Sequence, residues 1–339
     1  MTRISVVTRL VVLLSLIAVF VLSAGNAALA QYTLTSLVTT SADPNLVNAW
    51  GMAYATGGPF WISDNGTGKS TVYDATGSIV PLVVTIPAAS GAKGSPTGLV
   101  ANSTSGFVIT QNGVSGAASF IFATGDGTIS GWNPSVNASS AVIAVNNHPT
   151  ANYTGLTIAT VAGKTFLYAA NSSTNQIEIY DSNFNLTMTF GDSTLTGLAV
   201  YGVQAIKGKI YVTFKSSSGG AVDVFSTGGT LIKLLTKNGS KGPVLAPWGV
   251  ALAPSNFGTF SGDLLVGNVN NGKINAINPK TGKVAGQLKD TTGKVIAIPG
   301  LWALLFGGGS TATNGNTNQL FFAAGTDNYG TGEFGVINP

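Results

Sequence analysis

The stretch SDNGTGKST at residues 63–71 carries the Gly-Lys-Ser ending of a phosphate-binding loop. Such a loop also needs a glycine five residues before Gly68, where this chain has Ser63, and a helix behind it whose N-terminus holds the phosphate. The residues that follow, STVYD, are instead typical of a β-strand. We therefore interpret Lys69 as a residue of a hairpin loop and predict that no nucleotide binds there.

Nucleophilic and metal-binding side chains are scarce. The chain has no cysteine, which excludes disulfides, a thiol nucleophile and thiolate metal sites. Its single histidine, His148, lies in the loop-like segment NNHPTANY, and the chain contains no G-x-S-x-G motif that this histidine could serve. One histidine cannot build a multi-histidine metal site, so we expect an exposed loop residue rather than a catalytic base.

Side chains with oxygen ligands lie beside several strand-like runs. Asp64, Asn171 and Asn268 each end such a run, and Asn48 precedes another. If the loops converge, these oxygens could hold Ca²⁺, although only Asp64 in this set is charged. Asp and Asn also bond their own backbone in turns. We expect turn chemistry and no cofactor, and we keep Ca²⁺ bound through Asp64 as the alternative.

Aromatic side chains flank glycines that recur along the chain. Trp50, Tyr201 and Trp248 each precede such a glycine, and Trp302 follows one. These rings could pack between neighbouring structural units, or they could line a sugar-binding or peptide-binding channel mouth. We take Trp50 and Trp248 as candidate ligand-binding residues together with Asn48, Asp64, Asn171 and Asn268.

The recurring glycines define a repeat that must position these residues. The glycine-centred motifs WGMA, TGLV, TGLT, YGVQ, WGVA and PGLW place glycine at 51, 98, 155, 202, 249 and 300, at intervals of 47, 57, 47, 47 and 51 residues. Units of this length with several short strand-like runs each predict an all-β fold, a six-bladed β-propeller. Glycine at the start of each innermost strand would let six backbones converge on a narrow channel.

The two ends of the chain predict how the ring closes. The last unit offers three strands before Pro339, whereas the strand-like run at residues 32–40 stands alone before the first unit. The N-terminal strand should therefore complete the sixth blade as its outer strand. The longer second unit is ambiguous: residues 119–133 could be its third and fourth strands, or a third strand with an added hairpin.

The first thirty residues have the pattern of a secretory signal peptide. A lead with two arginines is followed by an apolar run of 13 residues, too short to span a bilayer, and by a small-x-small cleavage site at residues 28–30. We expect residues 1–30 to be removed and residues 31–339 to form one propeller domain. This domain is expected to be secreted or periplasmic, without a membrane anchor and monomeric.

Charge argues against nucleic acid as a partner. The predicted mature chain has 14 lysines, 12 acidic residues and no arginine, since both arginines lie in the signal segment. Without guanidinium groups or a dense lysine cluster beside aromatics, it lacks the footprint of a nucleic-acid reader. The charge is nevertheless uneven: residues 200–299 hold 11 lysines and 3 acids. They could orient the ring on an anionic cell-surface polymer, or they could be solvated lysines that discourage edge pairing.

Four longer motifs carry a resemblance that runs from about Tyr32 to Pro339. The segments DPNLVNAWGMA, FIFATGDGTISGWNP, LAPWGVALAPSNFGTFSGDLLVGN and GLWALLFG resemble an uncharacterised family of exported bacterial proteins, similar in pattern to NHL-repeat propellers. The resemblance implies a secreted propeller of bacterial origin and supplies no catalytic residues. A calcium site at the channel mouth would be similar to that of calcium-dependent lactonases on six-bladed propellers, which use several carboxylates.

From these observations we expect a binding or scaffold module for a carbohydrate or protein partner rather than an enzyme. The alternative is a calcium-dependent lactonase-like or lyase-like enzyme with its site at the channel mouth.

Overall fold

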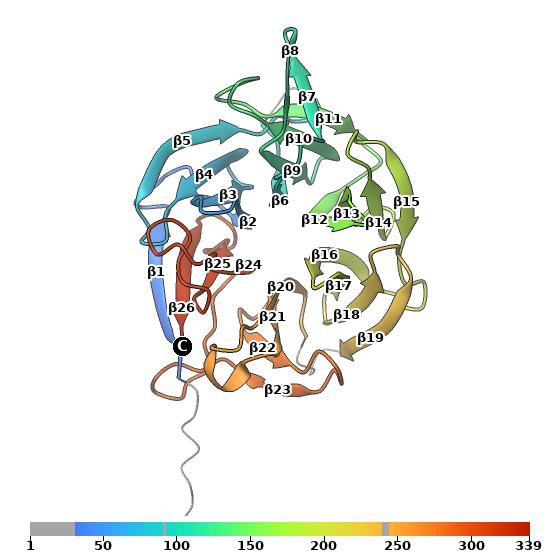
Figure 1. Cartoon of the computed structure of the whole chain (residues 1–339). Coiled ribbons are helices and arrows are strands. Elements are labelled where there is room, and N and C mark those ends of the chain that lie inside the picture. Colours follow the sequence, from blue (N-terminus) through green and yellow to red (C-terminus); the bar gives the residue numbers. More distant parts are fainter. Residues whose placement is uncertain (1–30, 91–92, 239–243) are drawn as a thin grey trace, which may run out of the picture.

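The computed structural model describes residues 31–90, 93–238 and 244–339, and six four-stranded antiparallel sheets are arranged around a central channel (Figure 1). The predicted six-bladed β-propeller is therefore confirmed. The signal-peptide prediction falls on residues 1–30, outside the described residues. Among the described residues, no helix is long and apolar enough to cross a membrane.

Each blade runs outward from the channel in the order of its strands. The strands are, in blade 1, β2 (Ala49–Tyr54), β3 (Phe60–Asp64), β4 (Lys69–Tyr73) and β5 (Ile79–Thr85); in blade 2, β6 (Pro96–Ala101), β9 (Phe120–Thr124), β10 (Thr128–Trp132) and β11 (Val142–Asn146); in blade 3, β12 (Tyr153–Val161), β13 (Lys164–Asn171), β14 (Gln176–Tyr180) and β15 (Leu186–Phe190). They continue, in blade 4, with β16 (Ala199–Ile206), β17 (Lys209–Ser216), β18 (Gly219–Ser226) and β19 (Leu231–Asn238); in blade 5, β20 (Pro247–Leu252), β21 (Leu264–Asn268), β22 (Ile274–Ile277) and β23 (Val284–Gln287); in blade 6, β24 (Leu301–Phe306), β25 (Leu320–Ala324), β26 (Glu333–Asn338) and β1 (Thr33–Thr39).

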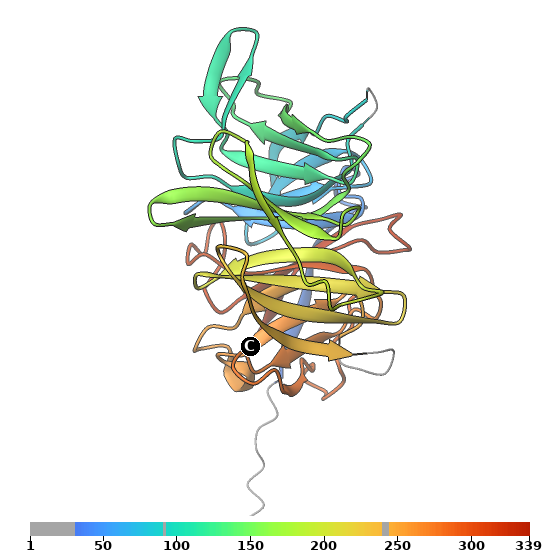
Figure 2. The same cartoon turned by 90° about the vertical axis from the view of Figure 1, so that its right-hand side faces the viewer.

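The ring has two faces because the strands alternate in direction. We call the face where the inner strands begin the link face; it carries the connections between blades and the turns from second to third strands. We call the other the hairpin face, which carries the turns from first to second strands and faces the viewer in Figure 1. Figure 2 gives the side view of the same ring.

The predicted ring closure is confirmed. Strand β1 pairs antiparallel with β26 from Thr33↔Asn338 to Thr39↔Glu333, so the first strand of the chain is the outer strand of the last blade. Val38 of β1 is 2% exposed and packs in a cluster that also holds Ile62 of blade 1 and Phe321 of blade 6. The apolar core therefore lies between adjacent blades, and one of these layers depends on β1.

The second blade differs from both sequence interpretations. Residues 119–133 supply its second and third strands, β9 and β10, instead of its third and fourth, and no hairpin is added to them. The extra residues form a separate hairpin, β7 (Val108–Gln111) and β8 (Val114–Ala117), between the first and second strands. This hairpin projects from the rim of the ring (Figures 1 and 2).

The sixth glycine motif was aligned three residues too early. In blade 1, Ala49 pairs with Asp64 and Met52 with Ile62; in blade 6, Leu301 pairs with Ala324 and Leu304 with Phe322. Ala303, not Gly300, therefore matches Gly51. Gly300 lies before β24 with a φ of +66°. As a consequence, Trp302 occupies the position of Trp50, directly before the residue that matches the glycine.

Lys69 lies in the β3–β4 hairpin, as its first strand residue rather than in its turn. It pairs with Asp64, and its Nζ donates to Asn45 Oδ1 at 2.7 Å. The chain continues as β4, so the helix that a phosphate-binding loop requires does not follow.

The closing strand generates a paired stability test. Val38→Ala should lower the free energy of unfolding by about 2 kcal/mol, because it removes buried methyl groups from the layer between blades 6 and 1. Leu34→Ala, on the 41% exposed face of the same strand, should change it by less than about 0.5 kcal/mol. Urea unfolding followed by circular dichroism measures both, and equal effects would contradict the closure account.

Candidate functional site

Aromatic rings from four blades converge where the inner strands begin. Register alignment places Trp50, Tyr201, Trp248 and Trp302 at equivalent positions in blades 1, 4, 5 and 6. Blades 2 and 3 carry Thr97 and Thr154 there. The inner strand of every blade has a register shift at this point, a bulge of the kind that redirects a side chain.

The converging rings pack face to edge around one stacked pair. The centroids of Trp50 and Trp302 lie 3.6 Å apart at an interplanar angle of 13°. Trp248 meets Trp50 at 6.4 Å and 79°, and Tyr201 meets Trp302 at 5.7 Å and 66°. These rings, together with Tyr329 described below, form what we call the aromatic mouth.

Hydrogen bonds fix two of the indoles and leave the third without a partner. Trp302 Nε1 donates to Asn48 Oδ1 at 2.9 Å, and Trp248 Nε1 donates to the Thr154 carbonyl oxygen at 2.8 Å. Trp50 Nε1 is buried without a hydrogen-bond partner among the described residues. Trp50 and Trp248 are half-buried, whereas Tyr201 and Trp302 are 3% exposed.

Tyr329 adds an exposed ring to this cluster. Its centroid lies 5.7 Å from that of Trp302 and its side chain is 44% exposed, and it is the one aromatic residue classed as exposed among the described residues. Asp327, Asn328 and Tyr329 all have positive φ, between 50° and 69°. Consecutive non-glycine residues in this region cost free energy, and such strain often accompanies a binding loop.

A lysine lies against the aromatic mouth. Lys215 Nζ is 3.6 Å from the centroid of the Tyr201 ring, a cation–π geometry. Burial lowers the pKa of Lys215 from its ordinary value. Lys215 follows Phe214, whose alignment with Asp64 puts Lys215 at the position of Asn65. This half-buried cation is suited to a ligand oxygen at the mouth.

Asn48 belongs to this site as a positioning residue. It is 7% exposed, its φ is +49°, and its Nδ2 donates to Asn65 Oδ1 at 3.1 Å while its Oδ1 holds the Trp302 indole. Its equivalent in blade 5, Ala246, also has a positive φ of 51°. The two inner strands that present Trp50 and Trp248 therefore start from the same unusual backbone conformation.

Asn171 and Asn268 are buried and hold the links that enter the inner strands. Asn171 Oδ1 accepts from the amide of Asn152 at 3.1 Å, and Asn268 Oδ1 accepts from the amide of Leu245 at 3.0 Å. Asn171 Nδ2 also donates to Glu178 Oε1 at 2.7 Å. Both asparagines are at most 1% exposed, so the structure places them in turn and link contacts, away from the surface of the mouth.

The Glu178 carboxylate joins a buried network between blades 2 and 3. Its Oε2 accepts from the hydroxyls of Tyr153 at 2.7 Å and Tyr180 at 2.6 Å, and Asn147 Nδ2 donates to both hydroxyls. Burial raises the pKa of both tyrosines. The network satisfies its polar groups internally, which is typical of a structural element.

Asp64 is fully buried, and neither of its carboxyl oxygens has a hydrogen-bond partner among the described residues. Burial raises its pKa well above the usual range, and the nearby Asp43 raises it further. A neutral carboxylic acid is a poor ligand for Ca²⁺. The described residues contain no group of three or more His, Cys, Asp or Glu side chains that could hold a metal.

A second pair of carboxyl groups lies between blades 3 and 4. Asp223 of β18 is fully buried and faces Asp192, which accepts from Thr194; Lys237 is the cation near both. Burial, and next the Asp192 carboxylate, raise the pKa of Asp223 to about 7. Both acids lie away from the aromatic mouth, and we assign them no ligand.

The sequence did not identify Lys215 or Tyr329 as site residues. Lys215 was visible as a break in the polar set at the ends of second strands, but the register needed to align it came from the structure. Tyr329 follows two residues, Asp and Asn, that tolerate positive φ; this signal marks a turn without showing which ring the turn approaches.

Comparisons with known proteins identify relatives without an assigned activity. No family model matches the chain. Two uncharacterised proteins of Acanthamoeba polyphaga mimivirus are 27% identical to it over 315 and 317 residues, covering 87% of this chain and 76% and 81% of theirs. These relatives are viral, so the expected bacterial family is not supported.

Solved structures with similar folds include enzymes. A streptogramin B lyase covers 91% of this chain and 97% of its own, with a TM-score of 0.54 and 11% identity. The PQQ-bound aldose sugar dehydrogenase of Streptomyces coelicolor covers 91% and 98%, with a TM-score of 0.57 and 12% identity. At this identity the likeness shows the propeller fold alone.

The buried acid of blade 4 generates a pH test. The folded state binds a proton at Asp223 more tightly than the unfolded chain, whose aspartates titrate near 3.9, so stability should fall as pH rises through about 7. The melting temperature should drop by roughly 5 °C between pH 5 and pH 8. Asp223→Asn should make this drop shallower, whereas the exposed control Asp327→Asn should keep it. An unchanged slope in Asp223→Asn would refute the assignment.

Calcium tests the metal alternative. After chelator treatment, returned Ca²⁺ should leave the melting temperature unchanged, because Asp64 is buried in its neutral form. A metal bound at a hundredfold excess over its Kd would instead stabilise the fold by about 2.7 kcal/mol. Calcium-dependent stabilisation that Asp64→Ala abolishes would reinstate the enzyme alternative.

Proposed function

We propose that this protein is an exported binding module that takes a carbohydrate at the aromatic mouth. The observation that carries the proposal is the convergence of Trp50, Tyr201, Trp248 and Trp302 at one end of the channel, with Tyr329 exposed beside them. A plain packing role would explain the two buried rings. It does not explain a strained loop that holds the fifth ring in solvent.

The chemistry of the mouth suits a sugar ring. Pyranose rings present apolar C–H faces that pack on aromatic faces, and their hydroxyls need a small number of placed polar groups. Lys215 Nζ and the unpartnered Trp50 Nε1 supply donors. The hydroxyl of Tyr329 supplies a group that can donate or accept.

The mouth favours a carbohydrate over a protein partner because its aromatic surface is confined. A specific protein interface needs about 1,000 Å² or more of complementary surface. The aromatic rings of this face are gathered at the channel, and Tyr329 is the ring classed as exposed among the described residues. Export remains part of the proposal and rests on the signal-like pattern of residues 1–30.

An array of neutral oligosaccharides identifies the ligand, and titration calorimetry then tests the site. Tyr329→Ala and Trp248→Ala should each weaken binding about five- to tenfold, the loss expected from one aromatic contact. Tyr329→Phe should retain most of the affinity because the ring face remains.

Leu231→Ala is the matched control, since Leu231 is 41% exposed on the outer strand of blade 4, against 44% for Tyr329. It should leave the affinity unchanged. A parent protein that binds no oligosaccharide, or a Tyr329→Ala variant with full affinity, would overturn the proposal; capture of a protein partner lost in Tyr329→Ala would favour the protein-binding alternative.

A further inference from the structure

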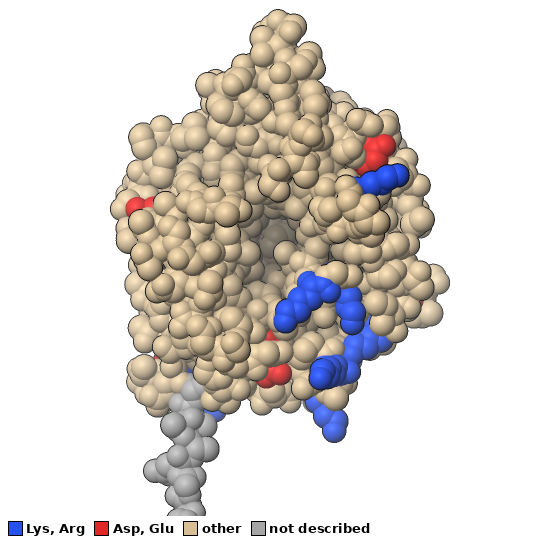
Figure 3. Space-filling view, viewed as in Figure 1, with Lys and Arg blue, Asp and Glu red and all other residues tan. Residues whose placement is uncertain are grey.

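The channel is open on the hairpin face, opposite the aromatic mouth. A cavity of about 280 Å³ is lined by residues from the inner strands of all six blades and ends at Trp248. Figure 3 shows its opening as a hollow at the centre of the ring. Its volume is close to the lower limit of ordinary ligand pockets.

The wall of this cavity is neutral and rich in backbone groups. Each inner strand pairs with its own blade along one edge, so its other edge offers N–H and C=O groups toward the channel. One of them is occupied: the Ala205 amide donates to Thr157 Oγ1 at 3.0 Å. The described lining residues include no lysine, histidine, aspartate or glutamate.

Lysines begin where the cavity ends. An adjoining cavity of about 280 Å³ shares Tyr54, Gln204 and Leu304 with the first and extends to Lys207. Lys207 and Lys209 flank the turn between β16 and β17, and both are exposed. The opening is therefore bordered by two cations of blade 4.

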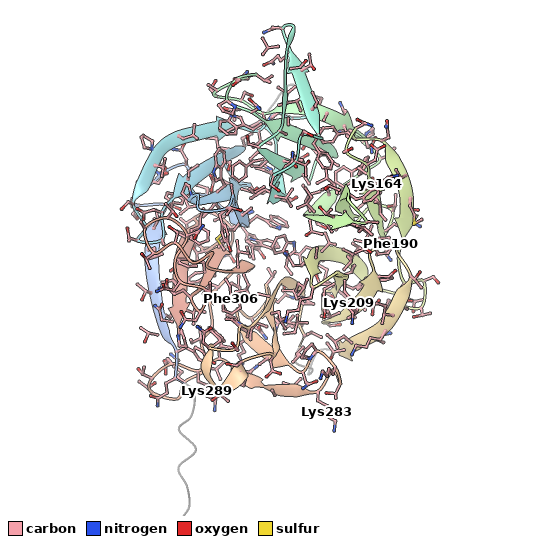
Figure 4. The ribbon with its side chains drawn as sticks, in the orientation of Figure 1. Lys164, Phe190, Lys209, Lys283, Lys289 and Phe306 are labelled. Atoms are coloured by element: carbon pink, nitrogen blue, oxygen red, sulfur yellow. The ribbon has the colours of Figure 1, made fainter. Side chains whose placement is uncertain are left out.

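More lysines continue outward over blade 5. Lys233 Nζ donates to the carbonyl oxygens of Pro279 at 2.9 Å and Lys280 at 2.7 Å, which holds the β22–β23 turn against β19. Lys280 and Lys283 of this turn are exposed. Figure 3 shows lysines gathered on one side of the hollow over these two blades, and Figure 4 labels Lys209 and Lys283. We call Lys207, Lys209, Lys280 and Lys283 the lysine arc.

Acidic residues do little to neutralise the arc. Residues 200–299 contain three acids, of which Asp223 is fully buried. Asp290 accepts from the amides of Thr292 and Lys294 within its own turn. Asp263, between β20 and β21, is half-buried, and burial raises its pKa. The exposed charge beside the opening is therefore mainly positive.

We infer that the hairpin face binds an anionic polysaccharide, with its acidic groups along the lysine arc and one end of its chain in the channel. Spaced ammonium groups complement carboxylates or sulfates that repeat along a sugar chain. The neutral end of the channel offers backbone donors and acceptors for hydroxyls. A nucleic acid fits less well, because no aromatic residue classed as exposed lies on this face among the described residues to stack a base.

This surface is separate from the aromatic mouth and does not depend on the proposed function. The test uses the full mature chain and a defined oligogalacturonate as probe, titrated at low and at physiological salt. The parent should bind the probe, and its affinity should fall as salt rises.

A variant with Lys207, Lys209, Lys280 and Lys283 each replaced by Gln should bind at least about tenfold more weakly and with a smaller salt dependence. Lys289→Gln combined with Lys294→Gln is the control; Figure 4 places Lys289 on the other side of the ring's lower rim. It should change affinity by less than about twofold. Lys207→Glu is a second, single-site variant in case the quadruple variant folds poorly, and Tyr329→Ala should have no effect.

Three results would overturn the inference. The first is a parent that does not bind oligogalacturonate at low salt. The second is a control that loses as much affinity per charge as the arc variants, which would indicate attraction to net charge alone. The third is tighter binding of single-stranded DNA than of oligogalacturonate with an equal number of charges, which would favour a nucleic-acid surface.

Discussion

The close approach of six inner strands determines the rest of this structure. A Cβ atom on Gly51 would lie 2.2 Å from the Thr97 carbonyl oxygen, one on Gly98 would lie 2.2 Å from the Leu156 amide nitrogen, and one on Gly249 would lie 2.4 Å from the Trp302 carbonyl oxygen. Real Cβ atoms do not approach backbone so closely, so glycine is required where each blade meets the next. The bulge beside each glycine directs the preceding residue to the channel mouth.

This constraint makes the two ends of the channel chemically different. The residues before the glycines, and before Ala303 in blade 6, are aromatic in four blades and threonine in two, so rings gather at the link face. At the hairpin face the same strands run into turns that carry lysine in blade 4 and, through the β22–β23 turn, in blade 5. One end therefore suits apolar sugar faces, and the other suits repeated negative charge.

The sequence predicted the elements that repeat and was less successful where one blade departs from the others. Glycine spacing predicted six blades, and the unpaired run at residues 32–40 predicted the closing strand; both are confirmed. Gly300 imitated the repeat in blade 6, where Ala303 is the matching residue, and this error hid the equivalence of Trp302 with Trp50. The hairpin of blade 2 was misplaced because strands of similar composition cannot be ordered without their pairing partners.

Among the candidate site residues, the separation follows burial. Trp50 and Trp248 lie in the aromatic mouth with Asn48 behind them, whereas Asp64, Asn171 and Asn268 are enclosed by links between blades. Composition could not separate these roles, because an oxygen at a strand end can either bind a ligand or hold a turn. Lys215 and Tyr329 meet the mouth through tertiary contacts alone.

The most direct test of the central claim, that the aromatic mouth is a ligand site, is residue-resolved hydroxyl-radical footprinting with and without the best oligosaccharide from the array. The account predicts that saturating ligand protects Tyr329, Trp50 and Trp248, while Trp61 and Trp132, which pack together between blades 1 and 2, keep their reactivity. Protection confined to residues outside the mouth, with Tyr329 as reactive as in the free protein, would contradict it.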